Sequence, residues 1–249
     1  MSISFLYKNL IDNVTSISEN TSQLGWGTAY LYDGDLNSAF RGTSTVTGTT
    51  TVLFNFGSAV YMDSVVCINN LTSTGTCWLL GGTIASVGDF TTGIPIDGLG
   101  TSYKYFGNQG FQYWKFNMKG ATAISQHQVN ELFLGKRTTI SEMPSYPFSE
   151  TIEESTIDLI SEKGNKWVYQ NYERKIWSFN FEGVNATTEN ALYKMYKYCR
   201  KNTQPLWMLL DPDNDPLNIK FVRFQSNAFL SEEITKNIFD ITMGLEQEI

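Results

Sequence analysis

The sequence predicts a mainly β protein, with an antiparallel β-sandwich followed by a smaller α+β domain that contains one main helix. Up to about residue 140, short apolar runs alternate with clusters of Gly, Thr, Ser and Asn, the spacing of many short strands. Residues 112–118 alternate between apolar and polar side chains, as a strand covered on one side does. A segment near residue 190 instead has apolar residues at helical spacing.

The elements expected in the first part follow one another closely. A polar turn, Asp33-Gly34-Asp35, is followed by a Thr- and Gly-rich spacer and then by apolar runs. Strands are expected at 52–57 and 63–70, and a closing strand at 129–134 that Gly135 stops. In the alternating segment, Trp114, Phe116 and Met118 share the face expected to be buried.

A change of composition marks a boundary. Pro144 and Pro147 restrict the residues before them to extended conformations. We therefore expect a sandwich over 1–137, a linker over 138–150 and an α+β domain over 151–249.

The second part combines strands with the helix. Strands are expected around Trp177–Phe181, at 206–210, at 218–224 and at 239–245, with a turn at 211–216. The helix is expected from about Glu189 to Lys201, with Thr187 or Thr188 as N-cap. Its apolar stripe consists of Leu192, Met195, Tyr196 and Cys199.

Composition excludes several classes of function. A hydrophobic content of 41% is enough to form a hydrophobic core. A net charge of −7 disfavours nucleic-acid binding, which needs a basic surface. No apolar run approaches the roughly 20 residues that cross a bilayer, and the start lacks the pattern of a secretory signal. We therefore expect a soluble protein made in the cytoplasm, with no nucleic-acid partner and no membrane insertion.

The few cysteine and histidine residues limit the metal sites and disulfides that the chain can form. Cys67, Cys77 and Cys199 form no Cys-x-x-Cys pair, and with one histidine a zinc site is not expected. Two interpretations of the cysteines stand: free buried thiols, or a Cys67–Cys77 bridge between neighbouring strands.

Catalytic patterns are missing. His127 is the only histidine, lies in a polar segment and is expected to be structural. The Asp211, Asp213 and Asp215 series suggests calcium, but Pro216 and Val222 occupy positions where a calcium loop needs Gly and Glu. A rigid turn fits better. We expect no enzymatic activity, no metal and no cofactor.

The Asp33–Asp35 turn has two interpretations. It is either a tight turn whose aspartates bond nearby backbone amides, or a loop that faces a cation or ligand. The first part also has many aromatic side chains that are able to stack on sugar rings, although aromatics at strand spacing mostly form core. They are Trp26, Tyr30, Tyr32, Trp78, Tyr103, Tyr105 and Trp114. The candidate ligand-binding residues are Asp33, Asp35, Asn37 and Trp78.

The first part resembles the discoidin-like, galactose-binding jelly-roll family. The resemblance rests on residues 32–40, the strands at 52–57 and 63–70, and the segments 112–116 and 129–135, in this order. Where the family usually carries a tryptophan after the turn, this chain has Phe40 and Arg41. The resemblance implies a jelly roll and possible contact with carbohydrate, without assigning a sugar site to particular residues.

The second part resembles the C-terminal region of tail-tip and baseplate proteins of tailed bacteriophages. The resemblance rests on the strand at 177–181, the helix, the segments 205–210 and 221–224, and the strand at 239–243. It implies a non-enzymatic virion protein, a minor or distal tail protein, that forms a homo-oligomeric ring and contacts other tail proteins. Exposed strand edges near Trp177, Phe179, Phe181, Phe239 and Ile241 are the expected assembly sites. The alternative is a standalone carbohydrate-binding protein.

Overall fold

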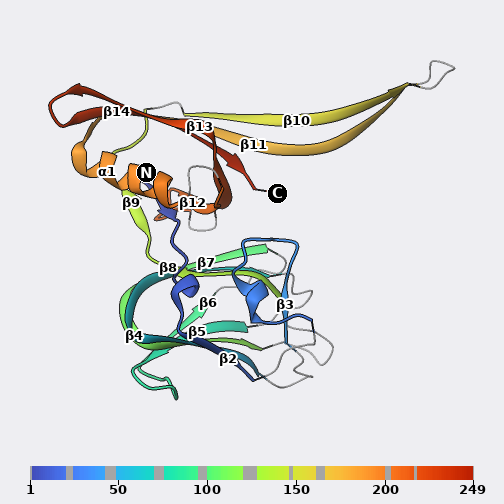
Figure 1. Ribbon diagram of the computed structural model, residues 1–249, viewed down its shortest axis with the longest axis vertical. Coiled ribbons are helices and arrows are strands. Elements are labelled where there is room, and N and C mark those ends of the chain that lie inside the picture. Colours follow the sequence, from blue (N-terminus) through green and yellow to red (C-terminus); the bar gives the residue numbers. More distant parts are fainter. Residues whose placement is uncertain are drawn as a thin grey trace. The chain divides into compact units, whose positions relative to one another are not determined.

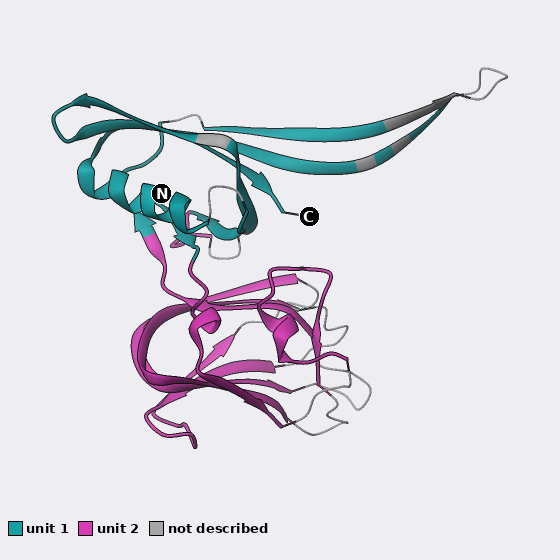
Figure 2. Ribbon diagram, viewed as in Figure 1, with its two compact units in different colours: residues 1–7, 139–210, 220–249 teal, residues 8–138, 211–219 magenta. Residues whose placement is uncertain are grey.

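The computed structural model describes residues 2–20, 25–42, 49–69, 76–94, 100–119, 128–145, 148–160, 166–199, 203–215 and 218–248. The chain forms two compact units, which Figure 2 shows in different colours. Unit 1 comprises Met1–Tyr7, Thr139–Leu210 and Lys220–Ile249, and unit 2 comprises Lys8–Thr138 and Asp211–Ile219. Most of the described chain is strand, in antiparallel sheets with a single α-helix among the described residues, as the sequence predicts.

Unit 2 is an antiparallel β-sandwich built around two long strands. Its sheet has the order β3-β8-β4-β7-β5-β6, with β2 paired to β4. The elements are η1 (Leu10–Asn13), β2 (Ser16–Glu19), η2 (Thr28–Leu31), β3 (Phe40–Arg41), β4 (Thr49–Asn69), β5 (Thr76–Gly82), β6 (Phe90–Ile94), β7 (Gly100–Lys119) and β8 (Gln128–Gly135).

The long strands β4 and β7 pass through both layers of the sandwich, and Figure 1 shows them curling back on themselves. The first half of β4 pairs with β2, and the second half pairs with β8. Between these halves the β4–β7 register shifts twice, and Gly57 has φ +74, a conformation that suits glycine. The two strands expected at 52–57 and 63–70 are therefore one bent strand. Trp114, Phe116 and Met118 are buried as predicted.

Unit 1 is a second antiparallel sheet, with the order β10-β11-β14-β13-β12-β1-β9. Its strands are β1 (Ile3–Leu6), β9 (Thr138–Ile140), β10 (Ser149–Ile160), β11 (Lys166–Asn185), β12 (Leu206–Leu210), β13 (Ile219–Thr235) and β14 (Ile238–Gln247). The helix α1 (Ala186–Tyr198) packs its buried Leu192 and Met195 into the same apolar core, so the predicted stripe is confirmed.

The units differ from the expected division of the chain. β1 pairs with β12, from Ile3 opposite Leu210 to Leu6 opposite Trp207, so the first residues belong to the sheet of the C-terminal part. The expected linker contains β9 and the start of β10. A four-residue strand buried along its whole length has no alternation that would reveal its partner.

The helix begins earlier than expected. Asn185 is the N-cap, because its side chain accepts hydrogen bonds from the N–H groups of Thr187 (2.8 Å) and Thr188 (3.0 Å). The expected caps, Thr187 and Thr188, are thus in the first turn. Cys199 caps the other end, so the helix also stops before the expected Lys201.

Candidate functional site

The most distinctive surface of unit 1 is a two-stranded ribbon. We use this name for residues 151–160 of β10 and 166–175 of β11, which pair with each other. β14 begins to pair with β11 at Ile176, the first residue after the ribbon, which lies opposite Glu246. Within the described chain, the ribbon therefore has no third strand. Figure 1 shows it extending well past the rest of the sheet. Two-stranded ribbons without a covering layer are marginally stable in water.

The ribbon carries large apolar side chains in solvent. Ile152, Trp167 and Val168 are each half exposed or more, at 55%, 50% and 57%. The register places Trp167 opposite Leu159 and Val168 opposite Asp158. Ile152 lies opposite Lys175, at the other end of the ribbon, so the three side chains are spread along it. Because no layer covers the ribbon in the described chain, it is a candidate interaction surface.

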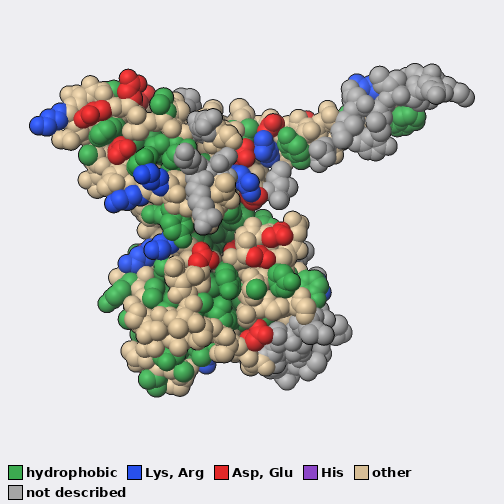
Figure 3. Space-filling model, in the orientation of Figure 1, with side chains coloured by type: hydrophobic (Ala, Val, Ile, Leu, Met, Phe, Trp, Pro, Cys, Tyr) green, Lys and Arg blue, Asp and Glu red, His purple; other side chains and the backbone are tan. Residues whose placement is uncertain are grey.

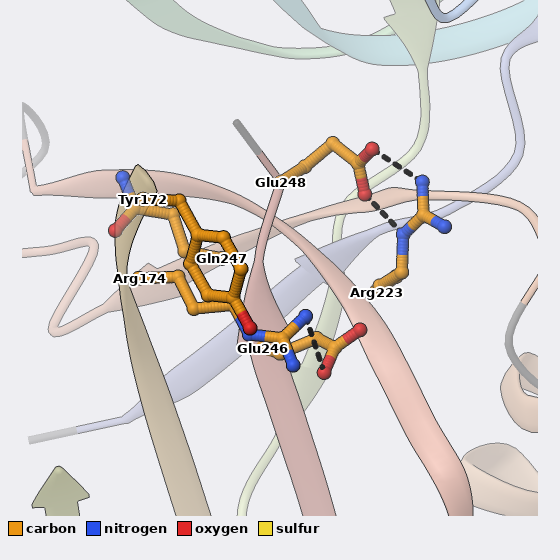
Figure 4. Close-up of a pocket in the computed structure, with 6 residues that line it drawn as sticks. All are labelled: Tyr172, Arg174, Arg223, Glu246, Gln247 and Glu248. Atoms are coloured by element: carbon orange, nitrogen blue, oxygen red, sulfur yellow. Dashed lines mark hydrogen bonds and ion pairs between the residues drawn. The ribbon is translucent and has the colours of Figure 1, made fainter. Parts of the chain in front are cut away.

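A shallow groove of about 320 Å³ lies where the ribbon joins the sheet, and Figure 4 shows its lining. Arg174 Nε bonds Glu153 Oε2 (2.6 Å), and its Nη1 lies 3.2 Å from Glu246 Oε2. The hydrogen bond with Glu153 raises the pKa of Arg174 above its ordinary value. The groove is lined by Tyr172, Arg174, Arg223, Glu246, Gln247 and Glu248.

The charges in this groove are matched within the chain. Arg223 forms a bidentate pair with Glu248 near the C-terminus. On β10, Glu150 accepts from Lys175 Nζ (2.6 Å) and from Trp177 Nε1 (2.8 Å), and the lysine bond lowers the pKa of Glu150. These contacts tie both strands of the ribbon to the sheet. They leave no unmatched arginine in the groove that would mark an anion site.

The expected assembly residues form the core of unit 1. The side chains of Trp177, Phe179, Phe181 and Ile241 are buried, and Phe239 packs against the same cluster. β14 pairs with β11 on one side and β13 on the other, so the expectation of an exposed edge is wrong for Phe239 and Ile241. β11 pairs with β10 only as far as Ser178, so at Phe179 and Phe181 its described strand partner is β14 alone. Alternation of apolar residues predicted these strands correctly, but it does not say whether an edge is free. Among the described strands, β10 of the ribbon is one end of this sheet and β9 is the other.

In unit 2, the Asp33–Asp35 turn is closed by its own side chains. Asp33 Oδ1 accepts from the Asp35 N–H (3.0 Å), and Asp33 Oδ2 accepts from Ser38 Oγ (2.7 Å). Asp35 Oδ1 accepts from the Asn37 N–H (2.9 Å) and from Asn37 Nδ2 (3.2 Å). Gly34 has φ +75. The first interpretation of this segment, a tight turn with aspartates on nearby amides, is the one the geometry supports.

A buried carboxyl group lies beneath this turn. Glu131 on β8 is 5% exposed, and its Oε2 accepts from the Gly34 N–H (3.1 Å). Burial, with further contributions from the nearby Asp33 and Asp12, raises the pKa of Glu131 to about 8. The neighbouring Asn130 donates to Leu36 O (2.8 Å). β8 therefore anchors the turn, and sequence reasoning missed this role of Glu131.

Trp78 does not join the turn. It lies on β5, opposite Asn117 of β7 and Gly93 of β6, whereas the turn contacts β8. β5 and β8 pair with opposite halves of the bent strands, in different layers. The four expected ligand residues therefore do not form one site.

An arginine–tryptophan pair at the end of β3 was not expected. The Arg41 guanidinium carbon lies 3.6 Å from the ring centroid of Trp26, and Arg41 Nε donates to Gln128 Oε1 (2.9 Å). Within the described part of the chain, the two Nη atoms of Arg41 have no hydrogen-bond partner. The signal in the sequence was that Arg41 is the one charged residue between Asp35 and Asp63.

The other chemical candidates that the structure describes lie in a turn or in the core. The backbone oxygen of Asp211 accepts hydrogen bonds from the N–H groups of Asn214 (3.2 Å) and Asp215 (2.8 Å). These bonds form a turn, as the rigid-turn interpretation predicts. Among the described residues, no group of three or more His, Cys, Asp or Glu is arranged to hold a metal ion. His127 lies outside the described residues. The three cysteines are free and buried, which raises their thiol pKa values.

No family model and no curated protein matches the sequence. Solved structures do match. A structure of the CBM32-1 and CBM32-2 domains of ZmpB from Clostridium perfringens, in complex with GalNAc, is 16% identical, with a TM-score of 0.43 over 53% of this chain and 35% of that chain. Chitosan-binding module 1 of a chitosanase/glucanase from Paenibacillus sp. IK-5 is 12% identical, with a TM-score of 0.43 over 51% of this chain and 98% of that one.

The described ranges contain no helix that is both long enough and apolar enough to span a membrane.

Proposed function

We propose that the protein is a non-enzymatic structural protein that assembles with copies of itself through unit 1 and displays unit 2 as a recognition module. The single observation that carries the proposal is the ribbon. It has open edges in the described chain and exposes Ile152, Trp167 and Val168. About half of each side chain is already buried, so covering the exposed half contributes on the order of 1 kcal/mol each.

The setting proposed is the tail tip or baseplate of a tailed bacteriophage, where copies would form a ring and contact other tail proteins. The strand, helix and strand order of the second part supports this setting by resemblance only. The turn at Asp211 and the matched charges of Arg174 and Arg223 have structural explanations, which agrees with a role outside catalysis.

The test is the oligomeric state of the full chain. Sedimentation velocity on the purified protein is expected to give one closed oligomer. A variant with Trp167→Ser and Val168→Ser, which removes apolar surface from the ribbon, is expected to shift the population towards monomer. The matched control is Tyr61→Ser, which removes a side chain of similar exposure (56%) from unit 2 and is expected to leave assembly unchanged. A wild-type protein that remains a monodisperse monomer at high concentration would contradict the proposal.

A second candidate function is carbohydrate binding by unit 2, and the Arg41–Trp26 pair favours it. An indole ring offers a flat apolar face to a sugar, and guanidinium N–H groups donate to hydroxyl or carboxylate oxygens. The hydrogen bond to Gln128 orders the Arg41 side chain before a ligand arrives. This lowers the conformational entropy that the side chain loses on binding. In a ring, weak single-site affinity would gain from avidity.

Glycan binding by the full chain tests this candidate. Binding of host-surface polysaccharide, measured by calorimetry, is expected to fall at least about tenfold in Trp26→Ala and in Arg41→Ala, about 1.4 kcal/mol. Trp78→Ala, in the other layer of the sandwich, serves as the control. Absence of binding by the wild type, or equal loss in the control, would count against carbohydrate binding at this site.

A further inference from the structure

One face of the ribbon carries acidic charge that the described chain does not match. Glu154 lies directly opposite Glu173, so both side chains point to this face, and both are exposed. Within the described residues neither glutamate has a basic partner, and the hydrogen bond that Glu173 accepts comes from the neutral Gln170 Nε2 (3.3 Å). Like charges directly opposite each other destabilise an antiparallel pair. A cation from another molecule would relieve this repulsion.

The basic residues closest to this pair along the ribbon are already used. Lys175 Nζ pairs with Glu150, and Arg174 Nε pairs with Glu153, each at 2.6 Å. Ile152 is two residues before Glu154 on β10, so it lies on the same face, and it is 55% exposed. We call this the acidic face of the ribbon. It presents apolar surface beside two unmatched carboxylates.

The outer face of α1 has the opposite charge. Leu192 and Met195 point into the core, whereas Tyr193, Lys194 and Lys197 are exposed. Lys197 Nζ lies 4.7 Å from the ring centroid of Tyr193, and within the described residues no carboxylate pairs with either lysine. Figure 3 shows basic side chains on the part of unit 1 that contains α1. Both lysines are therefore available to a partner, beside an exposed aromatic ring.

The two pairs of charges have similar spacing. Lys194 and Lys197 are three residues apart on a helix, which places their Cβ atoms about 5–6 Å apart. Glu154 and Glu173 face each other across an antiparallel pair, which places their Cβ atoms about 4.5–5.5 Å apart. Each lysine ammonium group, on its flexible stem, is thus able to reach one of the two carboxylates.

Within one copy these two surfaces cannot meet. The part of β11 between Glu173 and Asn185, after which α1 begins, is about 40 Å of extended chain. The helix has 13 residues and is about 20 Å long. Even if α1 ran straight back along β11, Lys197 would remain about 20 Å from Glu173. The cation that matches the acidic face must therefore come from another molecule.

We propose that the acidic face of the ribbon of one copy lies on the outer face of α1 of the next copy. The inference rests on the proposed assembly function and names its interface. Charge selects the occupant, because ribbon against ribbon would bring glutamates together and helix against helix would bring lysines together. The contact also covers the exposed Ile152 and Tyr193. Each copy carries both surfaces and so contacts a neighbour through each, as a ring requires.

Charge reversal on one surface at a time tests this contact. Glu154→Lys with Glu173→Lys makes the ribbon face basic, and Lys194→Glu with Lys197→Glu makes the helix face acidic. Each double variant is expected to raise the dissociation constant of the assembly at least about tenfold. The chain with all four substitutions again has opposite charges on the two surfaces, and is expected to assemble as the wild type does. Sedimentation velocity over a concentration series measures all of them.

The matched control is Lys119→Glu with Lys136→Glu, which changes the net charge by the same amount at exposed positions of unit 2. It is expected to leave assembly unchanged, and an equal loss in this control would overturn the inference. Recovery in the chain with four substitutions also shows that these changes do not prevent folding.

The other outcomes separate this contact from assembly itself. If the wild type assembles and both double variants assemble equally well, the contact is wrong while the proposed assembly function stands. If the chain with four substitutions stays dissociated, although circular dichroism shows native strand and helix content, the contact is also wrong. A wild-type monomer overturns both.

Discussion

Glu131 is the residue whose environment departs most from that of an exposed carboxyl group. It is buried below the Asp33–Asp35 turn, and its pKa is raised from 4.5 to about 8. A raised folded-state pKa means that the folded protein holds this proton where the unfolded chain has released it. The contribution of Glu131 to folding therefore becomes less favourable as pH rises from about 4.5 to about 8, and is constant above that.

Glu131→Gln is expected to remove this pH dependence. The amide keeps an oxygen that accepts from the Gly34 N–H but carries no charge to desolvate. The variant should match the wild type near pH 4 and be more stable by about 2–4 kcal/mol near pH 9, in denaturant titrations across this range. Glu154→Gln, on the exposed ribbon, is the control and should show no such trend. A stability difference between Glu131→Gln and the wild type that does not change with pH would contradict the assignment.

Residue types predicted the Asp33–Asp35 turn but not what holds it. Asp and Gly in this order favour a tight turn because aspartate oxygens accept neighbouring N–H groups, and that geometry is observed. Glu131 was missed because its partner Gly34 lies 97 positions away, and the hydrogen bond that holds Arg41 spans 87 positions. Arg41 and Trp26 are closer in the sequence, but no strand or helix period relates them. Sequence alternation predicts which face of a strand is buried, and does not identify the loop that lies on it.

At the scale of elements, the helix start depends on a single cap. Asn185 holds the N–H groups of Thr187 and Thr188, and Thr188 Oγ1 also donates to Glu142 Oε2 (2.6 Å). The expected cap at Thr187 or Thr188 was wrong because several polar residues in a row can each start a helix. Which one does so depends on where β11 ends, and β11 continues to Asn185.

Asn185→Ala is therefore expected to destabilise unit 1 by about 1 kcal/mol, within the usual range of about 0.5–2 kcal/mol for loss of an N-cap. Thr187→Ala is the matched control: its exposed side chain holds no helix N–H, so the change should be small. Chemical denaturation of both variants measures the difference. An equal or larger loss in Thr187→Ala would place the cap where the sequence alone suggested.

The strand β1 makes a second prediction at this scale. Phe5 is fully buried in the core of unit 1, opposite Met208 of β12. Phe5→Ala should cost about 3–5 kcal/mol, because it leaves a cavity in a packed core. Hydrogen exchange should show lost protection in β12 and β13. Phe54→Ala, in the core of unit 2, should instead lower protection in β4 and β7. Lost protection confined to unit 2 in Phe5→Ala would contradict the placement of β1.

At the scale of the whole molecule, the chain order of the units was only partly predictable. The proline-containing segment predicted a linker over 138–150, and the structure has β9 and the start of β10 there. The return of residues 1–7 to the later sheet was not predictable, since strand pairing between residues 3 and 210 leaves no local signal. The ribbon was also missed. A strand has the same sequence pattern whether it lies in a sheet of many strands or in a two-stranded extension.

The account of the whole molecule depends on what covers the ribbon. A neighbouring copy that covers the ribbon would explain both its exposed Ile152 and Trp167 and its open edges in the described chain. A cryo-EM map of the assembled full-length protein tests this most directly. The account predicts a closed ring in which the ribbon of each subunit packs against the next subunit. Ribbons that contact nothing in the map would contradict it.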